Sequence, residues 1–535
     1  MTNLSKGVPM HIKWFRITFI VCLILLTACS PPTNPGGKVT PSPEKTPEDP
    51  EPTPKGEDPT AVPTPTEVAK WDDLSIFEQT LTQAGQDSLD NLPPSNVYHL
   101  SLIIPENLTE PLTGSLEVRY VNLEINPVDE VYFRLFPNYY GGVLSVEQVE
   151  VDGQPVETSL ESDGTALRVE LSDWLNPGWE VEISMDYELV LPETMGGNYG
   201  LLGYFDDVLV LDTFYPMIPA YDQDGWYSDY PYPNGDLTYQ DASFYLVEVS
   251  APADLVIAAS GSVVEETVEN GMQHLTIASG PARDFYLAAS TSFTVSSKEW
   301  DGVLVSSYAL EGLQKHQDAA LDFAIQALET FSDLFGPYPY REFDLVSTPM
   351  QALGIEYPGI AGLFLDLYQE GESTRGLPNL TLLESVVAHE VGHQWFYNVV
   401  GNDQQNQPWV DEGLVQYITY VYFLQNYGAS AAQGLSDSWT QRLESSTDPS
   451  LAVGLPAGAY SPGDYSGIIY GKGPIFFQTL EESLGQEMLW QAISVYYQIQ
   501  YWQLADTETL KASLEFGCGC DLSLLFEIWI YPGAE

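Results

Sequence analysis

Two of the six histidines in this 535-residue chain, His389 and His393, lie four residues apart, and a glutamate follows at position 412. Residues four apart on an α-helix lie on one face, about one turn from each other. The spacing therefore calls for a helix whose two imidazole rings point to one place, and for a second helix that brings Glu412 there. Apolar residues recur at intervals of three and four from Leu382 to Phe396, which favours the first helix.

Two imidazoles and one carboxylate are a typical ligand set for a catalytic zinc ion, because they leave a fourth position open. We predict one zinc ion per chain, held by His389, His393 and Glu412. Glu390 follows His389 directly and points to a neighbouring face, so it suits a general base that takes a proton from water. A chance occurrence of this pattern is the alternative, and the correctly spaced Glu412 argues against it.

Acidic residues outnumber basic ones by 76 to 18, which gives a formal net charge of −58. Such a charge repels phosphate backbones, so we expect no nucleic-acid partner. The 44% of hydrophobic residues indicates globular domains rather than an acidic disordered chain. A solvated acidic surface is the simplest interpretation, and attraction of cationic peptides is the alternative. The composition does not fix an oligomeric state.

The first 28 residues carry three basic side chains and then an apolar run, Ile17 to Ala28, that is too short to span a bilayer. Leu26-Thr27-Ala28-Cys29 resembles the lipobox of bacterial lipoproteins. We therefore predict a lipoprotein signal peptide over residues 1–28 and an extracytoplasmic, membrane-bound protein anchored by lipid on Cys29. An ordinary cleaved signal and a free secreted protein are the alternative.

Residues 29–70 are rich in proline, threonine and glutamate, which predicts a disordered tether without a fold of its own. Such a tether would hold the folded part away from the membrane, at the cell surface.

Alternating apolar and polar residues, separated by turn residues, dominate the chain up to about residue 294. They predict an N-terminal β domain over residues 71–294, arranged like a sandwich or saddle. Beyond it, strand patterns at 303–308, 343–347 and 363–367 accompany helical patterns. This order resembles the thermolysin-like plan, a small sheet ahead of a helical zinc site, over residues 295–535. The predicted fold class is thus α+β with several domains.

Two further segments allow more limited predictions. The stretch from Phe214 to Tyr239 is rich in tyrosine and tryptophan, and it forms either a wall of the substrate cleft or an aromatic loop packed between domains. Cys518 and Cys520 lie only two residues apart, so we expect a small loop rather than a disulfide, which would be strained at this separation.

The metal motif and its surroundings, His389-Glu390-x-x-His393 and Trp409-x-x-Glu412-Gly413, resemble the aminopeptidase N family of M1-type gluzincin metallopeptidases, which includes leukotriene hydrolase. The resemblance runs from about Tyr98 to Pro532. It implies a zinc-dependent aminopeptidase that removes N-terminal residues from peptides, as a bacterial lipoprotein member without the C-terminal helical domain of the longer members. The alternatives are a zinc endopeptidase or other hydrolase on the same scaffold, and a non-catalytic surface binding lipoprotein.

Two more motifs carry this resemblance. Gly354-Ile355-Glu356-Tyr357 resembles the Gly-Ala-Met-Glu-Asn signature, which implies that Glu356, with Gly354 and Ile355, binds the free α-amino group of the substrate. Ile355 and Tyr357 depart from that signature. Ile469-Tyr470-Gly471-Lys472-Gly473 resembles the Tyr-x-Lys-Gly-Ala motif, which implies that Tyr470 stabilises the tetrahedral intermediate. Without the resemblance, Glu356 could equally be a turn carboxylate and Tyr470 a packing residue.

Overall fold

A computed structural model describes residues 71–371, 373, 376–531 and 533. The predicted signal peptide, Cys29 and the tether lie outside the described residues. None of the helices within residues 71–531 combines the length and the apolar character that a membrane crossing requires.

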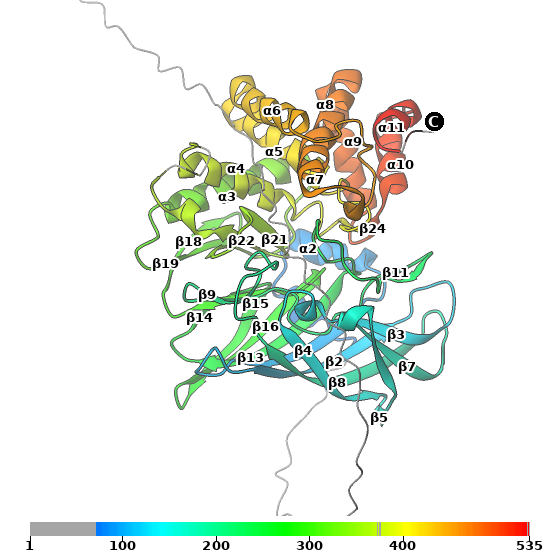
Figure 1. The fold of residues 1–535 in the computed structure, drawn as a ribbon, viewed down its shortest axis with the longest axis vertical. Coiled ribbons are helices and arrows are strands. Elements are labelled where there is room, and N and C mark those ends of the chain that lie inside the picture. The colour runs from blue at the N-terminus through cyan, green and yellow to red at the C-terminus, as the bar shows by residue number, and fades with distance from the viewer. Residues whose placement is uncertain (1–70, 372, 374–375, 532, 534–535) are drawn as a thin grey trace, which may run out of the picture.

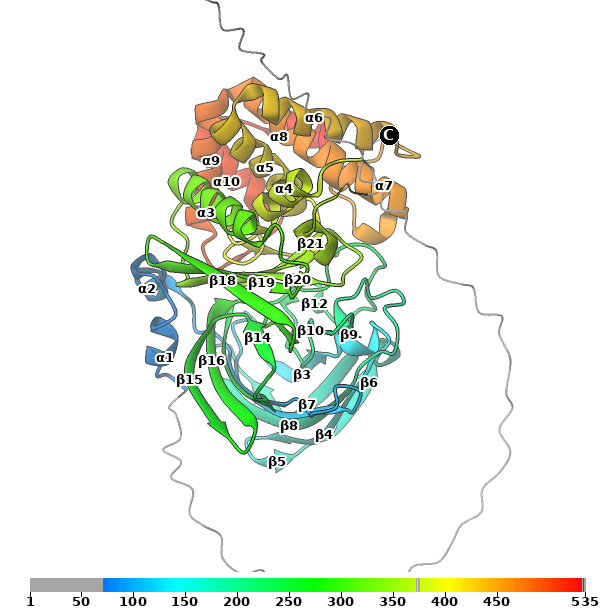
Figure 2. The same ribbon diagram turned by 90° about the vertical axis from the view of Figure 1, so that its left-hand side faces the viewer.

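The N-terminal part is built on a curved eight-stranded sheet, with smaller sheets lying against its concave side (Figures 1 and 2). Along the large sheet the strands are β15 (Ser262–Glu269), β16 (Met272–Ala282), β13 (Ser243–Pro252), β1 (Val97–Ile103), β2 (Leu112–Val121), β8 (Glu180–Val190), β4 (Val143–Val151) and β5 (Gln154–Pro155). The four-stranded sheet contains β14 (Val256–Ala259), β17 (Leu287–Ser290), β10 (Val208–Leu211) and β9 (Leu202–Phe205), and the three-stranded sheet contains β3 (Val128–Arg134), β7 (Ala166–Leu175) and β6 (Thr158–Glu161). Short helices α1 (Ser75–Glu78) and α2 (Gln83–Ser88) precede them, and β11 (Tyr221–Asp222) pairs with β12 (Gly225–Trp226).

A five-stranded sheet begins the C-terminal domain, and its helices lie above that sheet in Figures 1 and 2. The strand order is β18 (Phe293–Trp300), β19 (Val303–Leu310), β20 (Glu342–Thr348), β22 (Ile360–Phe364) and β21 (Gly354–Tyr357). The helices are α3 (Gln317–Leu334), α4 (Asn379–Gly392), α5 (Glu412–Tyr427), α6 (Ala429–Glu444), α7 (Pro462–Gly467), α8 (Gly473–Leu484), α9 (Gln486–Ile499), α10 (Thr507–Cys518) and α11 (Ser523–Trp529). Two short strands, β23 (Gly401–Asn402) and β24 (Leu504–Ala505), pair in parallel. The predicted α+β fold class is confirmed.

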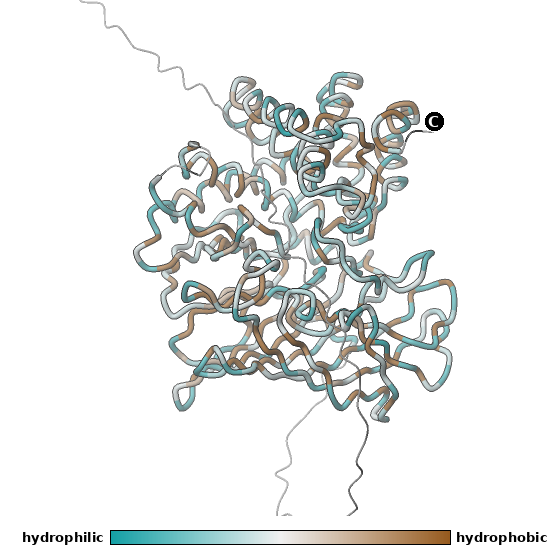
Figure 3. The backbone as a smooth tube through the Cα atoms, in the orientation of Figure 1, coloured by the Kyte–Doolittle hydropathy of each residue, from teal (hydrophilic) through white to brown (hydrophobic). Residues whose placement is uncertain are grey.

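Each domain has its own hydrophobic core, because the strands alternate buried and exposed residues and the helices bury one face. One core is formed mainly by strand residues of the N-terminal domain, and the other mainly by helical residues of the C-terminal domain. Figure 3 shows the same distribution as brown, hydrophobic segments along the strands and the inner helices.

A buried arginine connects the two domains. Arg283 follows β16 directly and is 2% exposed. Its Nε donates to the carbonyl of Asn398 (2.9 Å), and its Nη2 donates to the carbonyls of Val399 (3.0 Å) and Gln503 (2.8 Å). A guanidinium has five N–H donors, so a single side chain of the β domain can hold two separate segments of the other domain.

Three local expectations need correction. The predicted strand 363–367 is β22, which ends at Phe364 and continues as a 3₁₀ turn, Leu365–Tyr368. The helix that carries the histidines ends earlier than the apolar pattern from Leu382 to Phe396 suggested, since α4 ends at Gly392.

The third correction concerns the cysteines, because Cys518 and Cys520 form a disulfide. Gly519 between them has left-handed backbone angles (φ 62°, ψ 34°) at the end of α10. This turn brings the two Cα atoms to 5.3 Å, within the usual range for a disulfide. The expectation of a small loop without a disulfide was wrong, because it assumed a more extended chain between the two cysteines.

Candidate active site

The three predicted metal ligands converge, although they come from two helices. His389 lies in the last turn of α4, His393 caps that helix, and Glu412 is the first residue of α5. Nε2 of His389 is 3.2 Å from Oε2 of Glu412 and 3.2 Å from Nε2 of His393. His393 retains right-handed helical angles, so both rings still point to one side of α4.

The donor set fits a zinc ion. Nδ1 of His393 donates to the carbonyl of Phe396 (3.1 Å), so in the neutral imidazole Nε2 carries no proton and is the nitrogen that a metal would bind. Oε2 of Glu412 is buried and faces both rings, 3.2 Å from Nε2 of His389 and 3.6 Å from Nε2 of His393, and no other donor among the described residues bonds to it. A buried carboxylate oxygen without a donor calls for a cation. Burial acts to raise the pKa of Glu412, but contact with His389 and His393 outweighs it and lowers the pKa, so the carboxylate is available in its charged form.

The start of α5 is fixed by the residue before the ligand. Oδ1 of Asp411 accepts a hydrogen bond from the backbone N–H of Glu412 (2.8 Å), and Asp411 is 1% exposed. A carboxylate at a helix N-terminus also complements the helix dipole. This cap holds Glu412 at the position from which it reaches the histidines.

Glu390 lies on α4 beside the ligands, and it is 4% exposed. It shares a group with Glu356 and His393 whose nearest ligand atoms all lie within 4.8 Å of one another. Burial raises the pKa of Glu390 to about 8, although His393 acts in the opposite direction. A carboxyl group with a pKa near neutrality can accept a proton and release it again, as a general base that later acts as an acid must do.

Glu356 lies on β21, at the edge of the five-stranded sheet that faces α4. It is 6% exposed, and its Oε1 accepts a hydrogen bond from Nε2 of Gln404 (3.1 Å). The same oxygen is 3.8 Å from Nδ1 of His393. Burial raises the pKa of Glu356 well above its usual range, and His393 acts to lower it. Gly354 and Ile355 of the same strand also line the cavity.

Tyr470 reaches Glu412 from another part of the C-terminal domain. It lies in a π-helical turn, Ile468–Lys472, between α7 and α8. Its hydroxyl donates to Oε1 of Glu412 (2.5 Å). Burial and the charge of Glu412 raise the pKa of Tyr470 well above its usual value, so the phenol keeps its proton and remains a donor.

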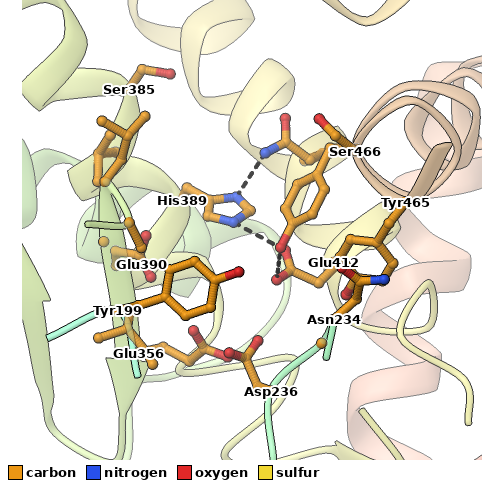
Figure 4. A pocket seen from close by; sticks show the side chains of 18 of the residues that line it. Tyr199, Asn234, Asp236, Glu356, Ser385, His389, Glu390, Glu412, Tyr465 and Ser466 are labelled. Carbon is orange, nitrogen blue, oxygen red and sulfur yellow. Dashed lines mark hydrogen bonds and ion pairs between the residues drawn. The ribbon is translucent and has the colours of Figure 1, made fainter. Parts of the chain in front are cut away.

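A cavity opens in front of these residues, and both domains line it (Figure 4). The β domain contributes Tyr139, Tyr140, Tyr199, Tyr232, Asn234 and Asp236. The aromatic segment from Phe214 to Tyr239 thus has one of its expected roles, because Tyr232, Asn234 and Asp236 form a wall of the site. Its first residues differ from both expectations, since Phe214 and Tyr215 are buried in the core of the β domain.

Asp236 was not identified as a site residue from the sequence. Figure 4 shows its carboxyl group pointing toward that of Glu356. Burial, and then the charges of Glu412 and Asp411, raise the pKa of Asp236 to about 7. The Gly235-Asp236 pair is a turn signal, which hints at a loop but does not say what the loop faces.

Comparisons with known proteins agree with this geometry. Residues 319–529 match the family model described as the peptidase family M1 domain. Aminopeptidase M1 of Arabidopsis thaliana is 26% identical over 303 residues, which are 53% of this chain and 33% of that protein. The mitochondrial Aminopeptidase 2 of Saccharomyces cerevisiae is 25% identical over 464 residues, 82% of this chain and 46% of that protein. This chain therefore spans between a third and a half of these relatives' length.

A solved structure of similar fold is the M1 zinc metallopeptidase of Deinococcus radiodurans, with a TM-score of 0.63 and 18% sequence identity. The match covers 82% of this chain and 94% of that one. A mutant of the Deinococcus enzyme has also been crystallised with the substrate Tyr-Ser-Ala, and it superposes equally well. At this identity the likeness concerns the fold.

Proposed function

We propose that this chain, whose residues 319–529 belong to peptidase family M1, is a zinc-dependent aminopeptidase. One observation carries the choice of an aminopeptidase. The buried carboxylate of Glu356 lines the cavity, and its Oε1 lies 3.8 Å from Nδ1 of His393, one of the predicted metal ligands. A buried carboxylate that faces a cavity is compensated when a cation enters, and the ammonium group of a peptide N-terminus is such a cation.

The residues around the cavity divide the work of peptide hydrolysis. His389, His393 and Glu412 would hold the zinc ion, which when bound acts as a Lewis acid toward a carbonyl oxygen. Glu390 accepts a proton from the attacking water and returns it to the leaving amine. The hydroxyl of Tyr470, which donates to Glu412 in the structure, would turn to donate to the oxygen that becomes negative as the tetrahedral intermediate forms.

Amino-end recognition belongs to Glu356 together with its neighbours on β21. The ammonium group that it binds belongs to the first residue of the substrate, so the bond cut is the first peptide bond. Asp236 from the β domain adds a second carboxyl group to the same end of the cavity.

The test compares leucyl-anilide with its N-acetylated form, with and without a chelator. We expect hydrolysis of the free amine only, and loss of activity on chelation that zinc restores. Glu356→Ala should lower kcat/KM on the free amine by roughly 100-fold, which corresponds to the loss of about 3 kcal/mol from a hydrogen bond between charged groups. The exposed Glu311→Ala is the control and should change nothing.

Equal hydrolysis of the acetylated substrate would favour the endopeptidase alternative. A chain that binds zinc and hydrolyses neither substrate would favour the non-catalytic binding protein.

We further propose that the protein is anchored outside the cytoplasm by lipid on Cys29 and acts on peptides there. The lipobox-like Leu26-Thr27-Ala28-Cys29 and the proline-rich residues that follow support this proposal. Cys29→Ser should move the protein from the membrane fraction to the soluble fraction, and an unchanged distribution would contradict the anchor.

A further inference from the structure

One loop of the β domain reaches the zinc site and lines the cavity beside Glu356. It runs from Tyr232 to Asp236, in the chain between β12 and β13, and Tyr232, Asn234 and Asp236 all line the cavity. A loop that carries part of a binding site must be held in place by its neighbours, because loops have few backbone partners of their own.

A single side chain of the C-terminal domain supplies most of those partners. Gln405 is fully buried, and its Nε2 lies within hydrogen-bond distance of three successive loop carbonyls, those of Asn234 (3.1 Å), Gly235 (3.0 Å) and Asp236 (2.8 Å). Its Oε1 accepts from the backbone N–H of Tyr232 (2.7 Å). One carboxamide therefore satisfies backbone groups at both ends of the loop.

The loop also approaches the neighbouring backbone closely. Gly235 has a φ of +82°, and a Cβ at this position would lie 2.8 Å from the carbonyl oxygen of Gln404. No larger residue could keep both this backbone angle and this approach. The close packing confines Asp236, the next residue, to one position relative to the site.

Gln404, the residue before Gln405, holds the carboxyl groups of Glu356 and Asp411. Nε2 of Gln404 donates to Glu356 (3.1 Å) and to Asp411 (3.0 Å), the residue that caps α5. Oε1 of Gln404 accepts from the hydroxyl of Thr238 in the β domain (2.8 Å). The adjacent Gln404 and Gln405 thus place the carboxyl groups of Glu356 and Asp236, which lie at the end of the cavity proposed to bind the substrate's amino group.

We propose that Gln405 is a positioning residue for substrate recognition, which holds the 232–236 loop so that Asp236 and Glu356 together bind the N-terminal ammonium group. Gln405 does not touch the substrate and acts through the loop. The inference rests on the proposed aminopeptidase activity.

The experiment replaces Gln405 by leucine, which keeps the size and removes all four contacts. Gln407→Leu is the matched control, because Gln407 lies in the same segment and accepts hydrogen bonds from the N–H and the hydroxyl of Thr507, away from the cavity. We expect Gln405→Leu to raise KM for leucyl-anilide about tenfold or more while kcat changes less than about threefold, since the lost contacts serve binding rather than the chemical step. Gln407→Leu should leave both constants near wild type.

A second readout separates positioning from loss of structure. Leucine and 2-hydroxy-4-methylpentanoate differ only in that a hydroxyl replaces the amine, so the inhibition constant of the hydroxy acid divided by that of leucine measures recognition of the ammonium group. This quotient should fall about tenfold in Gln405→Leu and stay unchanged in Gln407→Leu. Gly235→Ala perturbs the loop from the other side and should give the same KM shift, even if Gln405→Leu does not fold.

The outcomes are distinguishable. If the wild type does not hydrolyse leucyl-anilide, the proposed function fails. If the wild type is active but the inhibition ratio is unchanged in both Gln405→Leu and Gly235→Ala, the positioning role of Gln405 is overturned. Equal effects of Gln405→Leu and Gln407→Leu would also overturn it, because they would point to general destabilisation of the segment.

Discussion

Replacing Gly354 by alanine should impair proton transfer without removing the metal ligands. A Cβ at this position would lie 2.7 Å from Cδ of Glu390 and 2.8 Å from Cγ1 of Val386. Carbon atoms in contact prefer about 3.5–4.0 Å, so the carboxyl group must move by about 1 Å. The φ of Gly354 is not positive, so the backbone itself accepts alanine. A misplacement of about 1 Å can cost about 100-fold in rate, and we expect kcat to fall by that factor.

The assay is steady-state hydrolysis of leucyl-anilide together with the zinc content of the purified protein. Gly362→Ala is the matched control, since Gly362 pairs with Ile355 on the adjacent strand. Its Cβ would meet the terminal methyl of Met350 (2.8 Å), which can rotate away, so activity should stay within about threefold of wild type. If Gly354→Ala binds zinc and keeps a kcat within threefold of wild type, then the placement of Glu390 by this strand does not limit catalysis.

Two further predictions concern charge. Glu390→Gln should bind zinc as the wild type does and lose about 10²–10⁴-fold in kcat, measured with the same substrate, because it removes the proton acceptor; a rate near wild type would exclude Glu390 as the base. Asp284 is buried, accepts a hydrogen bond from the hydroxyl of Tyr397, and has a pKa raised to about 7, chiefly by burial. Because this folded pKa lies above the unfolded value of about 4, the folded state binds the proton more tightly, and the free energy of unfolding should fall by about 4 kcal/mol between pH 4 and pH 7 through this group. The free energy of unfolding of Asp284→Asn, measured by urea titration, should decline less than that of the wild type between pH 4 and pH 7. An equal decline in both proteins would rule out this assignment.

Features set by local spacing could be predicted from the sequence. His389 and His393 converge because a helix places residues four apart on one face, and Glu412 joins them at the start of the next helix. The strands of the β domain could be predicted because apolar and polar residues alternate along them with a period of two. The predicted α+β class is confirmed. The end of α4 at Gly392 was not predicted, because the apolar pattern continues to Phe396 and no proline follows in this stretch.

Features that depend on distant segments could not be predicted in this way. Asp236 lies 120 residues before Glu356, and no periodicity connects them, yet the fold brings both to one cavity. Gln404 and Gln405 look like surface amides in a polar stretch, and only the folded structure shows that both are buried. The Cys518–Cys520 disulfide was missed because it depends on the left-handed turn at Gly519.

The buried Arg283 has a consequence for how the molecule unfolds. Its donors reach carbonyls in the segments after α4 and before β24, while its own backbone continues a strand of the β domain. Unfolding of the C-terminal domain alone would remove the three carbonyl acceptors that it offers to Arg283, and the guanidinium and the carbonyls would exchange these hydrogen bonds for bonds to water. Two hydrophobic cores would ordinarily permit stepwise melting. Here Arg283 bonds to both domains, so the unfolding of one domain destabilises the other. The two domains should therefore unfold as one cooperative unit on heating.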